Sequence, residues 1–267
     1  SSWMMLTNML APLLMNVDRL MISHWNGSGA LASYTPAMDM AGKILILVGG
    51  SFSVLFPALG HHIKNDLDLA VQVYSSSILS VSWWMTPFVI LGAGVARPVM
   101  VLWLGKAHGE PAGIFLSIFF AGVLFSVVGL ICSTAVQAVG DARKASLIHA
   151  AQLPFYLFLL WLFLRNGSLI GVAWVWSFRH LLDTTALYLV AKSHGLKASR
   201  GSSFLAPIFI GLAIIIPIPY IHMHSAFLGA SLSAAVFVVW CLFAWFSKSG
   251  QKAIPTFVRT SIPFLFR

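Results

Sequence analysis

AGIFLSIFFAGVLFSVVGLICSTAVQA, residues 112–138, decides the fold class of this chain. The stretch contains no charged residue, and it is longer than the roughly 20 apolar residues that a helix needs to cross a hydrocarbon core. Seven further apolar stretches lie before and after it, at residues 4–24, 31–59, 71–95, 146–164, 169–191, 205–220 and 226–246. The sequence therefore predicts an all-α, polytopic transmembrane helix bundle with about eight spans.

The overall composition supports the same class. Of the 267 residues, 59% are hydrophobic and 9% are charged, which is far from the average of soluble proteins. A net charge of +9 would suggest nucleic acid as the partner of a soluble domain, but in a membrane protein it reflects topology, so nucleic-acid binding is excluded. Cys132 and Cys241 both lie in apolar spans, which favours two buried thiols over a disulfide or a metal site. No metal or cofactor is predicted.

The cations outside the spans indicate the orientation, because cytoplasmic loops carry the excess of Lys and Arg. Three of them, Arg97, Lys106 and Arg165, fall on one side. The other side, which is predicted to be cytoplasmic together with both chain ends, carries Lys64, Arg143, Lys144, Lys192, Lys197, Arg200, Lys248, Lys252, Arg259 and Arg267.

Six ionised residues inside the spans are the main functional clue. Each charge near a bilayer centre costs roughly 2.5–3.5 kcal/mol on insertion scales, so such residues pair with one another or line a wet cavity. Three are acidic and three are basic, so their charges sum to zero. They predict a transporter rather than an enzyme, and they are Asp18, Arg19, Asp39, Lys43, Arg179 and Asp183.

Each of these charges has a functional and a structural interpretation. The guanidinium group of Arg19 suits a phosphate or carboxylate, but it could equally form an ion pair with a neighbouring helix. Asp39 and Lys43 are four residues apart, as are Arg179 and Asp183, so each couple can neutralise itself on one helix face or contact a substrate.

The connections between the spans are short, and no soluble domain interrupts them. Asn26-Gly27-Ser28 and Asn166-Gly167-Ser168 are predicted to be tight outer turns. The stretch ARPVMVLWLG, residues 96–105, is too short to cross and is predicted to be an interfacial or re-entrant piece. The basic ending, residues 251–267, is predicted to lie along the cytoplasmic leaflet.

Three longer segments resemble a known family. They are VDRLMISHWNGSGALASYTPAMDMAGKILILVGGSFSVLFPALG (17–60), QAVGDARKASLIHAAQLPFYLFLLWLF (137–163) and GVAWVWSFRHLLDTTALYL (171–189), with LWLG (102–105) between the first two. Together they resemble the polysaccharide and O-antigen flippases of the multidrug/oligosaccharidyl-lipid/polysaccharide exporter superfamily. Gln152 departs from the glutamate that similar members often carry, which puts a proton-linked role of that position in doubt.

The resemblance implies twelve to fourteen helices in two six-helix lobes around a central cavity. Residues 1–191 would be the second lobe, residues 192–247 two peripheral helices and residues 248–267 a basic cytoplasmic tail. Because the chain begins at Ser1 and not at a methionine, it is expected to be a fragment, with the N-terminal lobe of the same protein as its partner.

The family's task is to flip an oligosaccharide linked to undecaprenyl pyrophosphate from the cytoplasmic to the periplasmic leaflet of the inner membrane, with possible H⁺ or Na⁺ coupling and membrane lipids as surroundings. On this basis Arg19, Lys43 and Arg179 are predicted to contact the pyrophosphate or sugar acids, and Asp18, Asp39 and Asp183 to orient them.

Three alternatives remain open from the sequence. A drug or cation antiporter of the same superfamily would need a predominantly acidic cavity. A membrane enzyme of glycan assembly generally needs a sizeable outer loop or a clustered catalytic set. A purely structural subunit would tolerate the loss of its embedded ion pairs.

Overall fold

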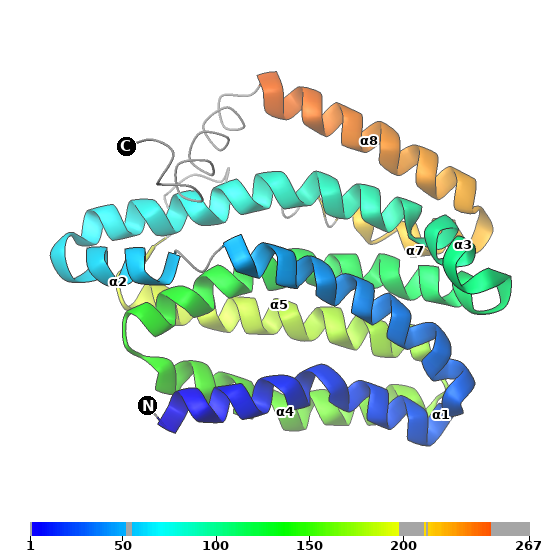
Figure 1. Ribbon diagram of the computed structural model, residues 1–267, viewed down its shortest axis with the longest axis horizontal. Helices are drawn as coiled ribbons and strands as arrows, with labels where there is room; N and C mark the ends of the chain where they lie inside the picture. The colour runs from blue at the N-terminus through cyan, green and yellow to red at the C-terminus, as the bar shows by residue number, and fades with distance from the viewer. Residues whose placement is uncertain (1, 52–54, 198–210, 212, 247–267) are drawn as a thin grey trace.

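The computed structural model describes residues 2–51, 55–197, 211 and 213–246 (Figure 1). Within this part of the chain, all regular secondary structure is helical, and long helices run side by side across the molecule. The predicted all-α helix bundle is confirmed. Its helices are α1 (Ser2–Ser51), α2 (Leu55–Asn65), α3 (Leu67–Ala138), α4 (Ala142–Arg165), α5 (Leu169–Ser193), α7 (Ile218–His224) and α8 (Ala226–Phe246).

Two glycines fold the longest helices back on themselves. Gly27 interrupts α1 with φ 79° and ψ −179°, and Gly105 interrupts α3 with φ 74° and ψ 172°. A positive φ is a conformation that glycine adopts without steric cost. Residues 2–26 and 28–51 therefore form a first and a second arm of α1, and residues 67–104 and 106–138 form two arms of α3 (Figure 1).

The arms and helices match most of the predicted spans. The arms of α1 and α3 correspond to the first four stretches, and α4, α5 and α8 correspond to the fifth, sixth and eighth. The turn at Asn26-Gly27-Ser28 is confirmed, and so is the turn at Gly167, where φ is 68°. Most of the seventh stretch and the whole basic ending lie outside the described residues.

Residues 96–105, predicted to be an interfacial or re-entrant piece, form the end of the first arm of α3 up to the bend at Gly105 and are not a separate element, while their place relative to a membrane stays a prediction. The first arm of α3 continues as one helix through Pro98 up to Leu104. No turn residue precedes Gly105 in this stretch, and a single proline inside a helix removes only one backbone hydrogen bond. The short apolar run therefore continues the helix.

Three helices in the described part of the chain are long and apolar enough to cross a membrane by length and composition: Asn16–Gly50 of α1, Leu67–Ala138 and Ala142–Arg165. α5 has sufficient length, but Arg179, His180 and Asp183 lower the hydropathy of its middle. Since α5 packs against α3 and α4, these polar residues lie within the bundle.

At the centre of the bundle, α5 packs against the second arm of α3. Small residues let these two helices approach closely. The ring of Trp176 covers Gly122, and the hydroxyl of Thr184 lies over Gly129. The Ser177 hydroxyl donates to the Ile118 carbonyl over 2.9 Å, and the Thr184 hydroxyl donates to the Phe125 carbonyl over 2.8 Å. Glycines that let two backbones approach, joined by hydroxyl hydrogen bonds, are typical of helix packing in membranes.

α8 attaches to the first arm of α3 where a proline has freed a backbone group. Pro87 has no N–H to donate to the carbonyl of Trp83, four residues before it. That carbonyl accepts a hydrogen bond from the indole N–H of Trp240 in α8 over 3.3 Å, and the two indole rings lie 5.3 Å apart. The interhelical bond thus replaces the one that the helix lost.

Asp141 connects three helix ends on the side that the cation count assigns to the cytoplasm. Its carboxylate accepts from the Lys144 ammonium over 2.7 Å and lies 2.9 Å from Nε2 of His194, the C-cap of α5. It also caps α4 by accepting from the Lys144 backbone N–H. The hydrogen bond from the Lys144 side chain is the main reason that the pKa of Asp141 is lowered.

Candidate functional site

The bend at Gly27 brings Arg19 and Asp39 together. Arg19 lies near the end of the first arm of α1, and its Nη2 donates to Oδ1 of Asp39 on the second arm over 2.5 Å. The two side chains remain 26% and 47% exposed. The ion pair that the sequence left as an alternative for Arg19 therefore exists, and it joins the two arms of one bent helix.

The couple of Asp39 with Lys43, one of the two interpretations that the sequence left open, does not form in the described fold. Asp39 pairs with Arg19, while Lys43 is exposed one helical turn further along and forms no ion pair with any residue that the structure describes. The spacing within one helix does not reveal a partner that a glycine bend brings in from the preceding arm. Arg19, Asp39 and Lys43 form an exposed surface, called here the charged face of α1.

Asp18 points the other way, into the bundle. Its side chain is fully buried and accepts from the Tyr34 hydroxyl over 2.8 Å and from the Arg19 backbone N–H over 2.9 Å. Two hydrogen bonds to one carboxylate offset part of the cost of burying it. α1, which carries Asp18, packs against α4 and also contacts α5.

Arg179 is only 8% exposed, and its couple with Asp183, which the sequence also left as one of two interpretations, does not form in the described fold. Its Nη2 donates to Nε2 of His180 over 3.1 Å, and its guanidinium carbon lies 5.3 Å from the centre of the Tyr156 ring in α4. A guanidinium group over an aromatic face gains cation–π attraction. Among the described residues, no carboxylate lies within ion-pair distance of Arg179.

Asp183 contacts α4 instead. Its Oδ1 lies 3.2 Å from Nε2 of His149 and accepts from the Gln152 amide over 3.0 Å. Since the packing of α5 on α4 offers two nitrogen donors, Asp183 turns across the helix interface and away from Arg179 on its own helix. Gln152 thus takes part in the site as an amide donor.

The eight residues that the structure gathers here form what we call the interior network. Three helices contribute to it, and the sequence analysis did not assign a site role to Tyr34 or Tyr156. The sequence does contain a pattern that could have pointed to Tyr156, because His149, Gln152 and Tyr156 recur at the helical period on one face of α4. The members are Asp18, Tyr34, His149, Gln152, Tyr156, Arg179, His180 and Asp183.

Several buried polar atoms in and beside this network have no hydrogen-bond partner within the protein. Buried polar groups are nearly always satisfied, so a cluster of exceptions calls for an explanation such as a ligand or water. The set offers mainly donors, which suit anionic or hydroxyl oxygens. The atoms are Nε of Arg19, Nδ1 of His149, Oε1 of Gln152, the hydroxyl of Tyr156 and Nε of Arg179.

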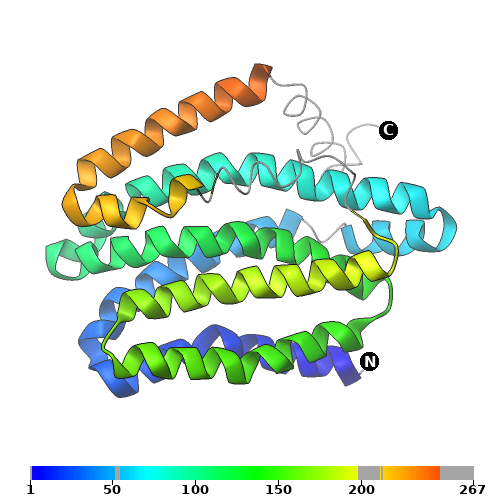
Figure 2. The same cartoon turned by 180° about the vertical axis from the view of Figure 1, so that it is seen from behind.

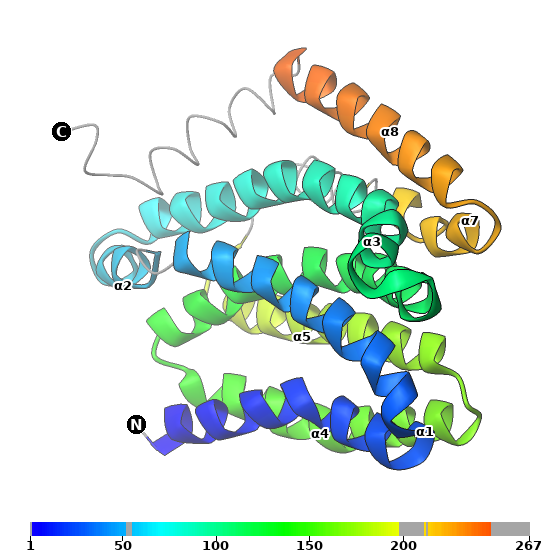
Figure 3. The ribbon, with the colours of Figure 1, turned by 45° about the vertical axis from the view of Figure 1, so that its right-hand side comes forward.

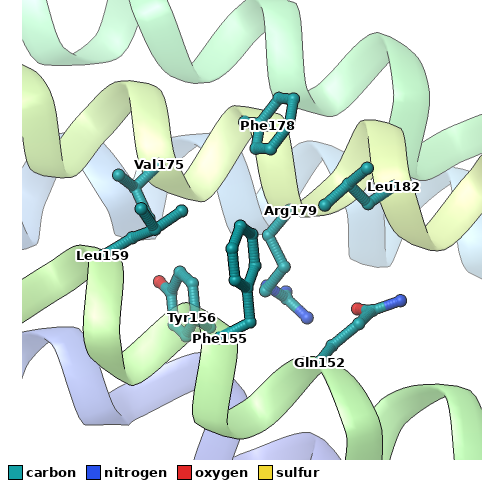
Figure 4. A pocket seen from close by; sticks show the side chains of 8 residues that line it. All are labelled: Gln152, Phe155, Tyr156, Leu159, Val175, Phe178, Arg179 and Leu182. Atoms are coloured by element: carbon teal, nitrogen blue, oxygen red, sulfur yellow. The ribbon is translucent and has the colours of Figure 1, made fainter.

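A recess lies between α4 and α5 on the side of the network away from α1 (Figure 4). It encloses about 210 Å³, its open mouth included. Arg179 reaches from α5 towards α4, with its guanidinium group beside Gln152 (Figure 4). The lining residues are Gln152, Phe155, Tyr156, Leu159, Val175, Phe178, Arg179 and Leu182.

Comparison with known proteins shows what this chain is similar to. Residues 1–112 match the family described as "Polysaccharide biosynthesis protein". This segment carries Asp18, Arg19, Asp39 and Lys43. A protein of Shigella flexneri named "Putative O-antigen transporter" is 28% identical over 185 residues, which are 69% of this chain and 44% of that protein.

The chain thus spans less than half the length of this curated relative. No solved structure matches the chain significantly. The transmembrane helices, the family match and the relative support polysaccharide and O-antigen flippases as the family of this chain.

Proposed function

We propose that this chain forms the second lobe and two peripheral helices of a flippase in the inner membrane. The flippase moves an oligosaccharide linked to undecaprenyl pyrophosphate to the periplasmic leaflet, catalyses no covalent step and works with the N-terminal lobe of the same protein. The ends of this segment lie in the cytoplasm. The family match and the transporter-named relative support this proposal.

The charged face of α1 is the observation that carries the proposal. Lys43 lies about 12 Å along the helix axis from the end of α1, and Arg19 about 12 Å from the bend at Gly27, so both lie well inside the span. Exposed charges at that depth are too costly to face hydrocarbon. The face therefore lines a water-filled cavity, between this lobe and the remainder of the protein.

The sign of that face favours an anionic cargo. It presents two cations, Arg19 and Lys43, and one carboxylate, Asp39, while Asp18 and Arg179 are buried. A cavity for cationic drugs would present mainly carboxylates. Fixed cations replace part of the hydration that a sugar pyrophosphate loses on leaving water.

The proposal includes coupling of transport to H⁺ or Na⁺. The interior network holds two carboxylates, Asp18 and Asp183, and one guanidinium group, Arg179, so its formal charge is −1 with neutral histidines. One H⁺ bound within the network, for example where Asp183 lies 3.2 Å from His149, would neutralise it. A Na⁺ ion at the same place would have the same effect.

Glycan export in cells tests the proposal. In a strain whose own gene is deleted, the full-length protein with Arg19→Ala or Arg179→Ala is expected to export no surface glycan. Lys43→Gln is the sharper variant, because Lys43 has no ion pair in the described fold whose loss could unfold the protein; we expect export to fall at least tenfold. Lys64→Gln, an exposed cation on α2, is the matched control.

Surface glycan is quantified by gel and immunostaining, and membrane levels of each variant by immunoblot. Normal export with Arg19 and Arg179 both replaced would refute the proposal.

A further inference from the structure

We infer that Asp39 determines which cargo the charged face of α1 accepts, because it occupies Arg19 until a stronger anion takes its place. The inference rests on the proposed function and deepens it, since the cargo group would be a multiply charged anion such as a pyrophosphate. The sequence predicts that Asp39 orients the cations, which has the opposite effect. An orienting residue assists anion binding, whereas a competitor opposes it.

Both arms of α1 lie along one outer side of the bundle. Figure 1 shows α1 in front of α4, and Figure 2, seen from behind, shows α4 and α5 in front of α1. The two arms diverge from their bend (Figure 3). On the second arm, exposed positions recur at Asp39, Lys43 and Ile46, a spacing of four and three residues that places them on one helix face. Asp39 and Lys43 therefore face the same space.

The ion pair occupies the part of Arg19 that a ligand would use. Oδ1 of Asp39 accepts from Nη2, a terminal nitrogen of the guanidinium group, over 2.5 Å. Nε of Arg19 is buried and has no hydrogen-bond partner among the described residues. A carboxylate that only oriented the group would bind it from the buried side and leave the terminal nitrogens to the ligand. Asp39 does the reverse, because its side chain is 47% exposed and binds a terminal nitrogen.

The bend between the two arms has a second contact that does not involve Asp39. On the buried side, the Tyr34 hydroxyl of the second arm donates to Oδ2 of Asp18 of the first arm over 2.8 Å, and both side chains are fully buried. A buried hydrogen bond to a charged group contributes more than an exposed ion pair, which water and salt screen. The pair of Arg19 with Asp39 can therefore open while the bend is kept.

A cargo anion can replace Asp39 because it offers more than one carboxylate does. A pyrophosphate has more negative charge and more oxygens, so it can bind two nitrogens of Arg19 and also reach Lys43, one helical turn from Asp39. An uncharged sugar or a lipid with a neutral headgroup has no such advantage and leaves Asp39 in place. Asp39 thus excludes weak ligands, and it returns to Arg19 when the cargo leaves.

Binding of inorganic pyrophosphate to the full-length protein in lipid nanodiscs tests the inference. Isothermal titration calorimetry at fixed pH and salt gives the Kd of each variant. Asp39→Asn keeps the shape of the side chain and removes its charge, and we expect it to lower the Kd at least fivefold. Asp68→Asn removes the same charge at an exposed position in the first turn of α3 and should leave the Kd within about twofold.

Two further variants show whether the effect depends on Arg19. In a protein that carries Arg19→Gln, adding Asp39→Asn should no longer lower the Kd, because the donor that it would free is absent. Asp39→Glu retains the competing charge and should keep the Kd within about twofold of the unchanged protein. The inference is overturned if Asp39→Asn binds pyrophosphate no more tightly than the unchanged protein, or not at all. An equal gain in the Arg19→Gln background overturns it as well.

The inference and the proposed function fail in different ways. If Lys43→Gln loses glycan export while Asp39→Asn does not tighten the binding of pyrophosphate, the flippase stands and the competition is wrong. If Arg19 and Arg179 are both replaced and export stays normal, the proposed function is wrong, even where Asp39→Asn tightens pyrophosphate binding.

Discussion

Asp18 shows how a single carboxylate is held in the interior of the bundle. It is fully buried, and the hydroxyl of Tyr34 is its one side-chain donor among the described residues. Removing a donor from a buried charged acceptor leaves a desolvated group unsatisfied, whereas removing a hydroxyl that has no partner leaves nothing behind. Tyr34 and Tyr156 are both buried, so they form a matched pair for this comparison.

Tyr34→Phe is therefore expected to destabilise the protein by about 1–3 kcal/mol, and Tyr156→Phe by much less. The midpoint of thermal unfolding in detergent, measured for the full-length protein and both variants at the same pH, checks this. Equal losses in the two variants would show that the hydrogen bond to Asp18 contributes little.

The sequence identified the site residues better than their partners. It placed six charges in spans. The structure puts three of them in the interior network and three on the charged face of α1: Asp18, Arg179 and Asp183, and Arg19, Asp39 and Lys43. Neither of the two couples that the spacing allowed forms in the described fold, because a rule for residues four apart considers one helix at a time. Arg19 and Asp39 are twenty residues apart and meet through the bend at Gly27.

At the scale of elements, the contact between α3 and α5 depends on glycines, which leave room for the facing helix. Gly122 lies under the ring of Trp176, where even one added carbon would meet the indole. Gly42 in the second arm of α1 is also helical, but nothing lies within 4 Å of the position that a Cβ would take. The first glycine is required by packing and the second is not.

Gly122→Leu is expected to cost about 1–3 kcal/mol through overpacking, with a lower midpoint of thermal unfolding. Gly42→Leu should be neutral or slightly stabilising, because glycine is a poor helix former. An unfolding midpoint for Gly122→Leu that matches that of Gly42→Leu would contradict the close packing of α3 on α5.

The helices themselves were predictable, since apolar length and turn residues mark them. The arms of α1 and α3, with α4, α5 and α8, occur where the apolar stretches indicated. What the sequence did not show is how a helix continues past a proline, as at Pro98, because the lost hydrogen bond is local and neighbours compensate for it. α5 was predicted as a span, although its polar middle leaves it below the hydropathy of the other long helices.

At the scale of the whole molecule, the turns that join the helices lie at the two ends of the bundle. The bends at Gly27 and Gly105 lie together, as the contact of Ser33 with His108 over 3.2 Å shows. The junction of Asp141 with His194 joins the end of α3 to that of α5. The cation count predicts the second end to be cytoplasmic.

Cysteine labelling tests this orientation. In a version with Cys132→Ala and Cys241→Ala, a membrane-impermeant maleimide applied to intact spheroplasts is expected to label Lys106→Cys and Arg165→Cys. Lys144→Cys and Lys192→Cys should react only after the membrane is permeabilised. The reverse pattern would invert the proposed topology.

The carbonyl of Trp83 has a consequence for any shortened form of this protein. Pro87 has no N–H to donate to that oxygen, and the indole of Trp240 donates to it from a helix more than 150 residues later. A truncation before Trp240 would remove this hydrogen bond and the contact between the two indole rings from the first arm of α3. α8 therefore contributes to the stability of the first arm of α3, and a shortened form that lacks it is expected to be less stable.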